Sequence, residues 1–281
     1  MITSFANKKI KEVQNLNKKA GAREESGFFT VEGIRMFREL PADRIKDIFV
    51  SESFHASCGE ELKKKIDSVP GELVSDEVFM HLSDTRTPQG ILAVVKQYSY
   101  TTEEILKISA SPAAGEEKTH SLFLMLETIQ DPGNLGTMMR AGEGAGLSGM
   151  ILNEKTADIY NPKVIRSTMG SIFRVPFAYT DNLVKIMGEM KKAGIRIFAA
   201  DLKGAVEYEK EDYTGPSAFL IGNEASGLSE AAADLADVRV KIPMRGEVES
   251  LNAAVAASIL LFEAARQRRR GSSEKPESPG K

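Results

Sequence analysis

Five short runs in the second half of the chain are apolar on both faces, and they restrict the fold more than any other feature. They are SLFLMLE at 121–127, GMILN at 149–153, IRIFAAD at 195–201, SAFLIGN at 217–223 and DVRVKIP at 237–243. Helix-like segments alternate with them, at Leu135–Ala145, Pro162–Thr168, Leu183–Ala193 and Leu251–Arg268. Strands that are apolar on both faces are typical of a parallel sheet covered by helices on each side. We therefore predict an α/β fold whose ligands bind at the carboxyl ends of its strands.

A smaller alternation occupies the first part of the chain. The strand-like runs FFTVEG, DIFVSES, GELVSD and GILAVVK alternate with the helix-like runs IRMFREL, CGEELKKKID and DEVFMHL. This pattern predicts a small α/β domain at 1–110. Ser, Pro, Ala and Gly dominate 111–120, which we predict to be a linker. The larger domain is expected at 121–270, and 271–281 is expected to be a disordered tail because it has no apolar residue.

Composition excludes several classes of protein. The 281 residues include 42% hydrophobic and 27% charged residues, as in ordinary globular domains. One cysteine and three histidines predict neither a disulfide nor a metal site. The apolar run 251–265 is shorter than the about 20 residues that a membrane span needs. No signal-peptide core is evident, so we expect a cytoplasmic protein that does not enter a membrane.

The net charge of −3 shows no overall basic excess, so any surface that binds an anion must be local. Residues 1–23 hold six Lys or Arg against one acid, and 266–270 hold four arginines. These two ends of the chain are the candidate basic patches for RNA.

The helix expected after SLFLMLE is unusually rich in glycine. Asn134 is a favoured N-cap, and Gly136, Arg140 and Gly144 follow at i, i+4 and i+8 on one stripe. Each internal glycine costs about 0.5–1 kcal/mol relative to alanine. Two interpretations remain: either a ligand or another backbone approaches Arg140, or the glycines permit tight packing and Arg140 is a solvated surface charge. The run GEGAGL lacks the third glycine of GxGxxG, and GxxxxGK[ST] does not occur.

Polar residues also follow the strand SAFLI. Gly222 and Glu224 come just after its carboxyl end, where an open α/β sheet presents ligand-binding backbone. Glu224 is alternatively a structural carboxylate. The loop IPMRGEVES then leads to a helix that we expect to be buried all round, with Asn252 as a buried amide at its start. A second segment, NPKVIRSTMGSIFRVPF, offers either an anion seat around Arg166 and Arg174 or a turn with surface arginines.

Taken in order, NLGTMMRAG, IRSTMGSIFRVPF and IGNEASGLS with IPMRGEVESLNAAVAASILLFEA closely resemble the three motifs of the SpoU family of RNA 2'-O-ribose methyltransferases. GFFTVEGIRMFREL and LSDTRTPQGILAVV resemble the L30e-like substrate-binding domain that often precedes them. The resemblance implies a Rossmann-like parallel sheet with a C-terminal trefoil knot. It also implies a homodimer that binds S-adenosylmethionine and RNA, with catalytic groups drawn from both subunits.

The resemblance assigns roles to individual residues. The cofactor is expected to contact the backbone of Gly222, Ile242 and Leu251, with Asn223 and Met244 alongside. Asn134 and Arg140 match the catalytic pair of the first motif. The polar residues expected around the transfer site are Glu224, Ser250 and Asn252.

The implied activity is S-adenosylmethionine-dependent methylation of a ribose 2'-hydroxyl in ribosomal RNA. Because arginine is not deprotonated in proteins, we expect Arg140 to stabilise the developing alkoxide electrostatically rather than to act as a base. Transfer RNA is an alternative substrate. A non-catalytic RNA-binding or ribosome-assembly protein on the same fold is another alternative, although Asn134, Arg140 and Asn252 are all present.

Overall fold

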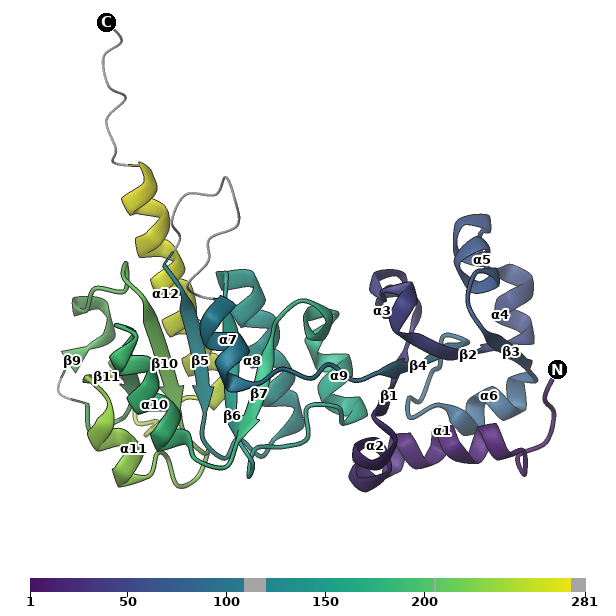
Figure 1. The fold of residues 1–281 in the computed structure, drawn as a ribbon, viewed down its shortest axis with the longest axis horizontal. Helices are drawn as coiled ribbons and strands as arrows, with labels where there is room; N and C mark the ends of the chain where they lie inside the picture. The colour runs from purple at the N-terminus through teal and green to yellow at the C-terminus, as the bar shows by residue number, and fades with distance from the viewer. Residues whose placement is uncertain (109–119, 205, 274–281) are drawn as a thin grey trace, which may run out of the picture. The chain divides into compact units, whose positions relative to one another are not determined.

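The computed structural model describes residues 1–108, 120–204 and 206–273, which divide into two units (Figure 1). Unit 1 comprises Met1–Tyr98 together with Asp158–Phe173. Unit 2 comprises Ser99–Ala157 and the described residues from Arg174 onward. The predicted linker, apart from residue 120, lies outside the described residues, as does the predicted tail from residue 274.

Unit 1 is built on a four-stranded mixed sheet in the order β1-β4-β2-β3. Strand β4 is antiparallel to both of its neighbours, and β2 is parallel to β3. The strands are β1 (Phe28–Glu32), β2 (Ile45–Ser51), β3 (Gly71–Val74) and β4 (Ile91–Lys96). The helices are α1 (Lys8–Lys18), α2 (Ala20–Ser26), α3 (Ile34–Glu39), η1 (Ala42–Arg44), α4 (Glu52–Ser57), α5 (Glu60–Asp67), α6 (Asp76–Leu82), α9 (Pro162–Thr168) and η2 (Ser171–Phe173).

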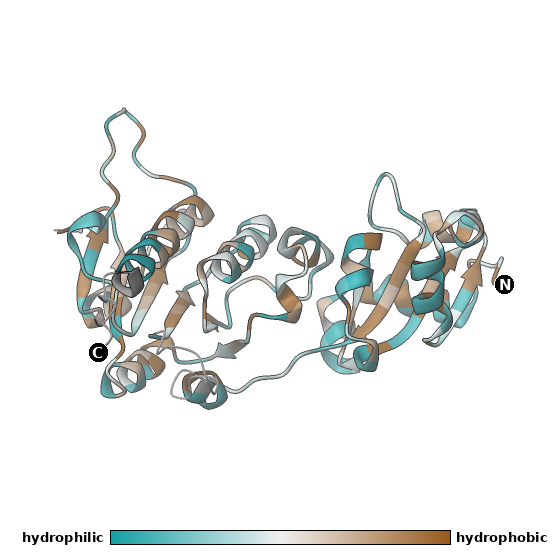
Figure 2. Cartoon of the chain, turned by 90° about the horizontal axis from the view of Figure 1, so that it is seen from above, coloured by the Kyte–Doolittle hydropathy of each residue, from teal (hydrophilic) through white to brown (hydrophobic). Residues whose placement is uncertain are grey.

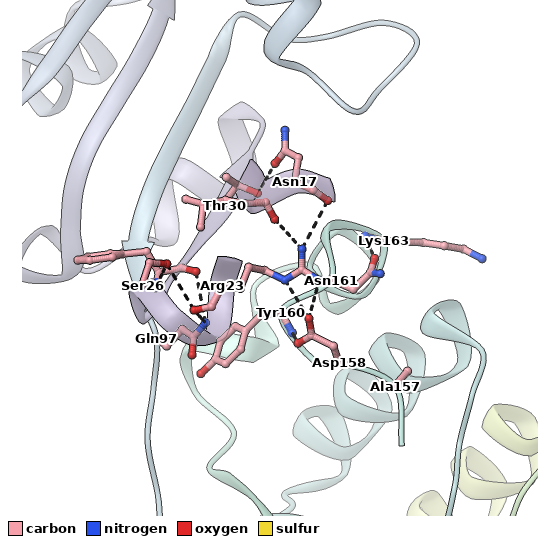
Figure 3. A network of polar contacts seen from close by, with 12 residues as sticks. Asn17, Arg23, Ser26, Thr30, Gln97, Ala157, Asp158, Tyr160, Asn161 and Lys163 are labelled. Carbon is pink, nitrogen blue, oxygen red and sulfur yellow. Dashed lines mark hydrogen bonds and ion pairs between the residues drawn. The ribbon is translucent and has the colours of Figure 1, made fainter. Parts of the chain in front are cut away.

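A buried arginine joins the two chain segments of unit 1 (Figure 3). Arg23 is only 4% exposed, and its Nε and Nη2 donate to Oδ2 of Asp158 at 2.8 and 2.6 Å. Its Nη1 donates to the carbonyl of Leu16 at 2.6 Å. A buried guanidinium must be paired in this way, because leaving one charge of a buried pair alone costs about 3–5 kcal/mol. Arg23 therefore has a structural role.

Unit 2 contains a seven-stranded sheet in the order β7-β6-β5-β10-β8-β11-β9, and all of its strand pairs are parallel. The central strands are buried throughout and are coloured as hydrophobic in Figure 2. The strands are β5 (Leu122–Leu126), β6 (Gly149–Asn153), β7 (Phe177–Thr180), β8 (Arg196–Ala200), β9 (Val206–Glu207), β10 (Ser217–Ile221) and β11 (Val238–Lys241). The predicted parallel sheet is therefore observed.

Helices cover this sheet on both faces. One face carries α7 (Thr102–Ile108), α10 (Leu183–Lys192) and α11 (Glu230–Leu235), which share a core cluster with β5, β8 and β10. The helices α8 (Pro132–Ala145) and α12 (Ala253–Ser273) pack against each other, and α12 also packs against β10 (Figure 1). A short η3 turn at Tyr208–Lys210 precedes β10.

Several boundaries differ from the prediction. Helix α12 begins at Ala253 rather than at residue 251, and it continues to Ser273 because the first proline after Arg268 is Pro276. It is also not buried all round, since Val255 and Phe262 are 47% and 46% exposed. At 52–53 the chain forms helix α4, not the end of a strand, because the side chain of Ser51 caps that helix.

Candidate active site

A cavity of about 440 Å³ opens at the carboxyl ends of β8, β10 and β11 in unit 2. Ala200, Ile221 and Val240, which lie at or near those three ends, contribute to its lining. The chain leaves β10 there through the loop 222–229 and leaves β11 through the loop 242–252. This is the edge at which α/β sheets bind their ligands.

The cavity brings together the residues that the sequence assigns to the cofactor. All five of these residues line it: Gly222, Asn223, Ile242, Met244 and Leu251. Glu224 and Ser250, two of the predicted transfer-site residues, line the same cavity. Residues from two loops separated by about 20 positions in the sequence therefore converge on one site.

Close backbone packing shapes the loop after β10. A Cβ atom on Gly222 would lie 2.4 Å from the carbonyl carbon of Gly227, so only glycine fits there. The N–H groups of Asn223 and Gly227 each donate to the other's carbonyl oxygen at 3.0 Å. The carboxylate of Glu127, just after β5, accepts from the N–H and the hydroxyl of Ser229 at 2.8 and 2.7 Å. The loop is thus held at both ends against the sheet.

Three predicted catalytic residues form a chain of hydrogen bonds beside the cavity. Nδ2 of Asn134 donates to Oε1 of Glu224 at 3.0 Å, and Nδ2 of Asn252 donates to Oδ1 of Asn134 at 2.9 Å. The three side chains come from α8, from the loop after β10 and from the start of α12. Their polar groups fix one another's orientation at the cavity rim.

Two details of these residues differ from the prediction. Asp131, not Asn134, is the N-cap of α8: its side chain accepts from the N–H of Asn134 at 2.8 Å, and Pro132 occupies the first turn. Asn252 is exposed rather than buried, and its Oδ1 accepts from the N–H groups of Ala254 and Val255. Asn252 therefore caps α12 and contacts Asn134 with the same side chain.

Arg140 lies apart from this group. It is exposed on α8, does not line the cavity, and has no hydrogen bond or ion pair with the residues that the structure describes. Gly144, one turn further along α8, faces α12: a Cβ there would lie 3.4 Å from Cζ of Phe262. Gly142 is packed more closely, since a Cβ there would lie 2.7 Å from Cδ2 of Leu147. Tight packing accounts for Gly142, the contact at Gly144 is an ordinary one, and Arg140 remains available on the surface.

The comparisons with known proteins agree with this geometry. A model of the SpoU rRNA Methylase family matches residues 121–262, half of the chain. The chain belongs to the SpoU rRNA methylase family. A model of the MRM3-like substrate binding domain matches residues 7–93. The predicted family is therefore confirmed.

Several known methyltransferases are similar over nearly the whole chain. The 23S rRNA (guanosine(2553)-2'-O)-methyltransferase RlmP of Bacillus subtilis is 31% identical over 93% of this chain and 97% of its own length. The AdoMet-bound rRNA methyltransferase from Sinorhizobium meliloti has a TM-score of 0.79 at 30% identity, covering 94% and 97% of the two chains. AviRb from Streptomyces viridochromogenes, in complex with AdoMet, has a TM-score of 0.80 at 28% identity, covering 94% and 98%. The predicted α/β fold class is confirmed by these structures.

The structure adds cavity residues that the motifs of the SpoU family did not indicate. Asp201 and Lys203 line the cavity from the loop after β8, and Arg239 and Lys241 line it from β11. Arg239 is held by ion pairs with Asp201, at 3.3 Å, and with Asp234. For Asp201 and Lys203, the sequence signal was the polar run DLKG directly after the apolar run IRIFAA. Because parallel strands end at a shared edge of the sheet, polar residues that follow a strand lie near the ligand site.

Strained backbone at Thr128 also supports the site. Its φ of 62° lies in the left-handed region, which a β-branched residue rarely adopts. Its N–H donates to Oδ1 of Asn153, and its carbonyl accepts from Nδ2 of Asn223, both at 2.8 Å. Thr128 thereby connects the ends of β5, β6 and β10. No sequence pattern identifies such a residue.

The predicted basic patch at 266–270 is largely occupied by internal contacts. The guanidinium of Arg268 donates to the carbonyls of His120, Ser121, Tyr213 and Gly215 at 2.6–3.2 Å. Burial lowers the pKa of Arg268 to about 10, so the group stays charged at neutral pH. Arg266 is paired with Glu263 at 2.6 Å.

Within the described residues there is no group of three or more His, Cys, Asp or Glu side chains that could hold a metal ion. No helix in the described part of the chain has the length and apolar character needed to cross a membrane. Neither observation points to a site besides the cavity of unit 2.

Proposed function

We propose that this protein transfers the methyl group of S-adenosylmethionine to a ribose 2'-hydroxyl in ribosomal RNA. The observation that carries the proposal is the cavity at the strand ends, with the hydrogen-bonded chain Glu224–Asn134–Asn252 beside it. Relatives described as rRNA methyltransferases, two of them solved with AdoMet, support the reaction and the cofactor. The enzyme class and the cofactor predicted from the sequence are those of its family.

The chemistry of the cavity suits S-adenosylmethionine. Its lining combines apolar side chains such as Ile221, Ile242 and Leu251, which suit an adenine ring, with polar residues of two loops. Carboxylates, among them Glu224 and Asp201, suit a sulfonium and an ammonium cation. The volume also falls in the range of about 300–1,000 Å³ typical of small-molecule sites. The residues present therefore fit the cofactor.

S-adenosylmethionine would supply an electrophilic methyl carbon on a sulfonium sulfur. The ribose 2'-oxygen forms the new C–O bond as the S–C bond breaks, and its proton leaves to solvent. We propose that Asn134, Glu224 and Asn252 orient the ribose, since their hydrogen bonds already fix their positions. Such positioning can supply several kcal/mol of the barrier reduction. Ser250, which lines the cavity, is proposed to assist them.

We assign Arg140 to electrostatic stabilisation of the developing alkoxide. It does not line the cavity of its own chain, so we place it in the active site of a partner subunit. Val255 and Phe262 form an exposed apolar stripe two turns long on α12, and Phe262 adjoins Gly144, one turn from Arg140. A homodimer that covers this stripe would bring Arg140 to the second site.

The C-terminal trefoil knot is also proposed. It would involve the loops 222–229 and 242–252 and the start of α12, which all border the cavity. Glycine at position 222 permits the close backbone contacts that such threading requires. Threaded loops would hold the cofactor in the cavity that they line.

We propose separate roles for the two domains predicted from the sequence. Residues 1–110 recognise the RNA, in keeping with the MRM3-like match at 7–93, and residues 121–270 carry out the transfer. A single cysteine and an RNA substrate fit the cytoplasm. Transfer RNA is the alternative substrate, since some relatives are described as tRNA/rRNA methyltransferases.

The proposal is tested by incubating the purified protein with S-adenosylmethionine labelled in its methyl group and with 23S ribosomal RNA or, in a parallel sample, transfer RNA. We expect the label in a single nucleotide whose 3' phosphodiester resists alkaline cleavage, since that cleavage needs a free 2'-hydroxyl. An Arg140→Ala variant should keep RNA and cofactor binding but lose most of the transfer rate. Label in a base, or in transfer RNA alone, would contradict the proposed substrate. Absence of S-adenosylmethionine binding would favour the non-catalytic alternative.

A further inference from the structure

Two of the basic residues near the N-terminus serve the fold. Nζ of Lys9 donates to Asp47 and Glu72 at 2.9 and 2.7 Å, and the Glu72 carboxylate is the main reason that the pKa of Lys9 is raised. Arg23 is buried on Asp158 (Figure 3). Neither cation is free to meet another molecule.

The remaining lysines share one exposed face of α1. At about 100° per residue, Lys8, Lys11 and Lys18 fall within an arc of about 80°, and they span about 15 Å along the helix. Lys11 and Lys18 are exposed and have no hydrogen bond or ion pair through their side chains within the described part of the chain. Lys19, also exposed, directly follows the helix. The acid Glu12 lies about 40° beyond this arc, 3.9 Å from Lys8.

The opposite face fixes the helix in place. Ile10, Val13 and Leu16 are buried, and α1 packs against α6. The side-chain amides of Gln14 and Asn17 donate to the carbonyls of His81 and Leu82 at 3.3 and 2.7 Å. The lysines are therefore carried on a rigid support, so binding does not have to order the backbone.

The lysines at 63–65 on α5 do not carry such a surplus of unpaired charge. Lys63 and Lys64 share α5 with Glu60 and Glu61, so their charge is balanced locally. Lys65, the third member, donates to the carbonyls of Arg38 and Leu40 at 2.8 Å. A surplus of unpaired positive charge on a rigid face is thus a property of α1 and not of the lysine cluster on α5.

We propose that the exposed face of α1 with Lys8, Lys11 and Lys18, together with Lys19 directly after the helix, binds the phosphate backbone of the RNA substrate. The inference rests on the proposed function, which makes RNA the substrate. A row of exposed ammonium groups, of which only Lys8 is paired with an acid, is complementary to a polyanion. Contacts with phosphates add affinity without sequence preference. The region matched by the MRM3-like substrate binding domain begins at residue 7 and includes this helix.

Salt dependence of binding gives the test. Filter binding of 23S ribosomal RNA, between 50 and 200 mM KCl, compares the wild type with Lys11→Gln/Lys18→Gln and with the matched control Lys63→Gln/Lys64→Gln. Each phosphate contact contributes about 0.7–0.9 to the slope of log K against log salt. We expect the α1 double variant to bind more weakly and its slope to become shallower by about 1.4–1.8. The control should change by less than half as much, and Glu12→Gln should tighten binding.

The outcomes separate the inference from the function on which it rests. If the α1 variant binds RNA with the same affinity and salt slope as the wild type, the inference is overturned. The exposed face of α1 would then be a contact surface for a protein partner. Equal losses in the α1 variant and the control would also overturn it, because net charge alone would then explain binding. A wild type that transfers methyl groups to RNA while the α1 variant binds normally keeps the proposed function intact. If the wild type does not bind RNA, both the inference and the proposed function are contradicted.

Discussion

Asn134 is the central residue of the candidate site, because it both donates to Glu224 and accepts from Asn252. Replacing it with alanine removes both hydrogen bonds but leaves every lining residue of the cavity in place, because Asn134 itself does not line it. We expect kcat to fall about 10²-fold, in the range seen when one orienting donor is removed. The dissociation constant for S-adenosylmethionine, measured by calorimetry, should stay within about twofold.

Thr137→Ala is the matched control for Asn134→Ala, since Thr137 lies one turn along α8 and is exposed. It should behave as the wild type. If Asn134→Ala retained full kcat, the hydrogen-bonded chain would have no part in the transfer.

Gly222 tests the shape of the cofactor loop. A Cβ there would meet the backbone of Gly227 and Leu228 at 2.4–2.5 Å, whereas one on Gly215 would meet nothing within 4 Å. Gly222→Ala should lower the free energy of unfolding by about 1–3 kcal/mol, as overpacking does, and weaken S-adenosylmethionine binding. Gly215→Ala should do neither. Denaturant unfolding and calorimetry measure the two effects, and equal behaviour of the variants would refute the loop geometry.

Helix α12 is positioned by its C-terminal half as well as by its packing on α8. Arg268 donates to four backbone carbonyls, and Gln267 accepts from the N–H of Tyr213 at 2.9 Å. Arg268→Ala leaves those carbonyls without their donor, at a cost of about 1–3 kcal/mol for each buried acceptor that finds no water. We expect unfolding at clearly lower denaturant concentration, and no such change for the exposed Arg270→Ala.

The sequence predicts elements with a clear local marker well and unmarked ones poorly. The ends of β6 and α9 coincide with the prediction, since an apolar run and a proline at the first turn mark them. Helices α7 and α11 were not predicted, because no proline marks their first turn and their apolar residues show no clear 3.6-residue period. The start of α8 was misplaced because Asp131 and Asn134 are both good caps, and Pro132 decides between them.

All five residues that the motifs assign to the cofactor line the cavity, because local sequence sets what each loop presents. The motifs did not indicate the other polar lining residues, such as Asp201 and Arg239. Sequence could not show that Asn134 bonds Glu224 across 90 positions, or that Thr128 is strained between two strand ends. Those facts depend on which strands are neighbours, and the order of strands in a sheet has no local signal.

In the proposed homodimer, we place Arg140 in the active site of the partner subunit. A mixed dimer of an Arg140→Ala subunit and an Asn134→Ala subunit tests this. If Arg140 acts in the partner's site, one site of the mixed dimer has both groups intact, so about half of the wild-type activity returns. If Arg140 acts within its own subunit, both sites lack a group and the mixed dimer is as inactive as either parent. Differently tagged subunits, co-expressed and purified through both tags, supply the sample.

Mapping of ribose methylation across ribosomal RNA tests the proposed methyl transfer in the cell. RNA is compared from cells with the protein, without it, and without it but supplied with either the wild type or the Asn134→Ala variant. We expect that one 2'-O-methyl group disappears with the protein, returns with the wild type and does not return with the variant. Identical methylation of ribosomal RNA in all four samples would contradict it.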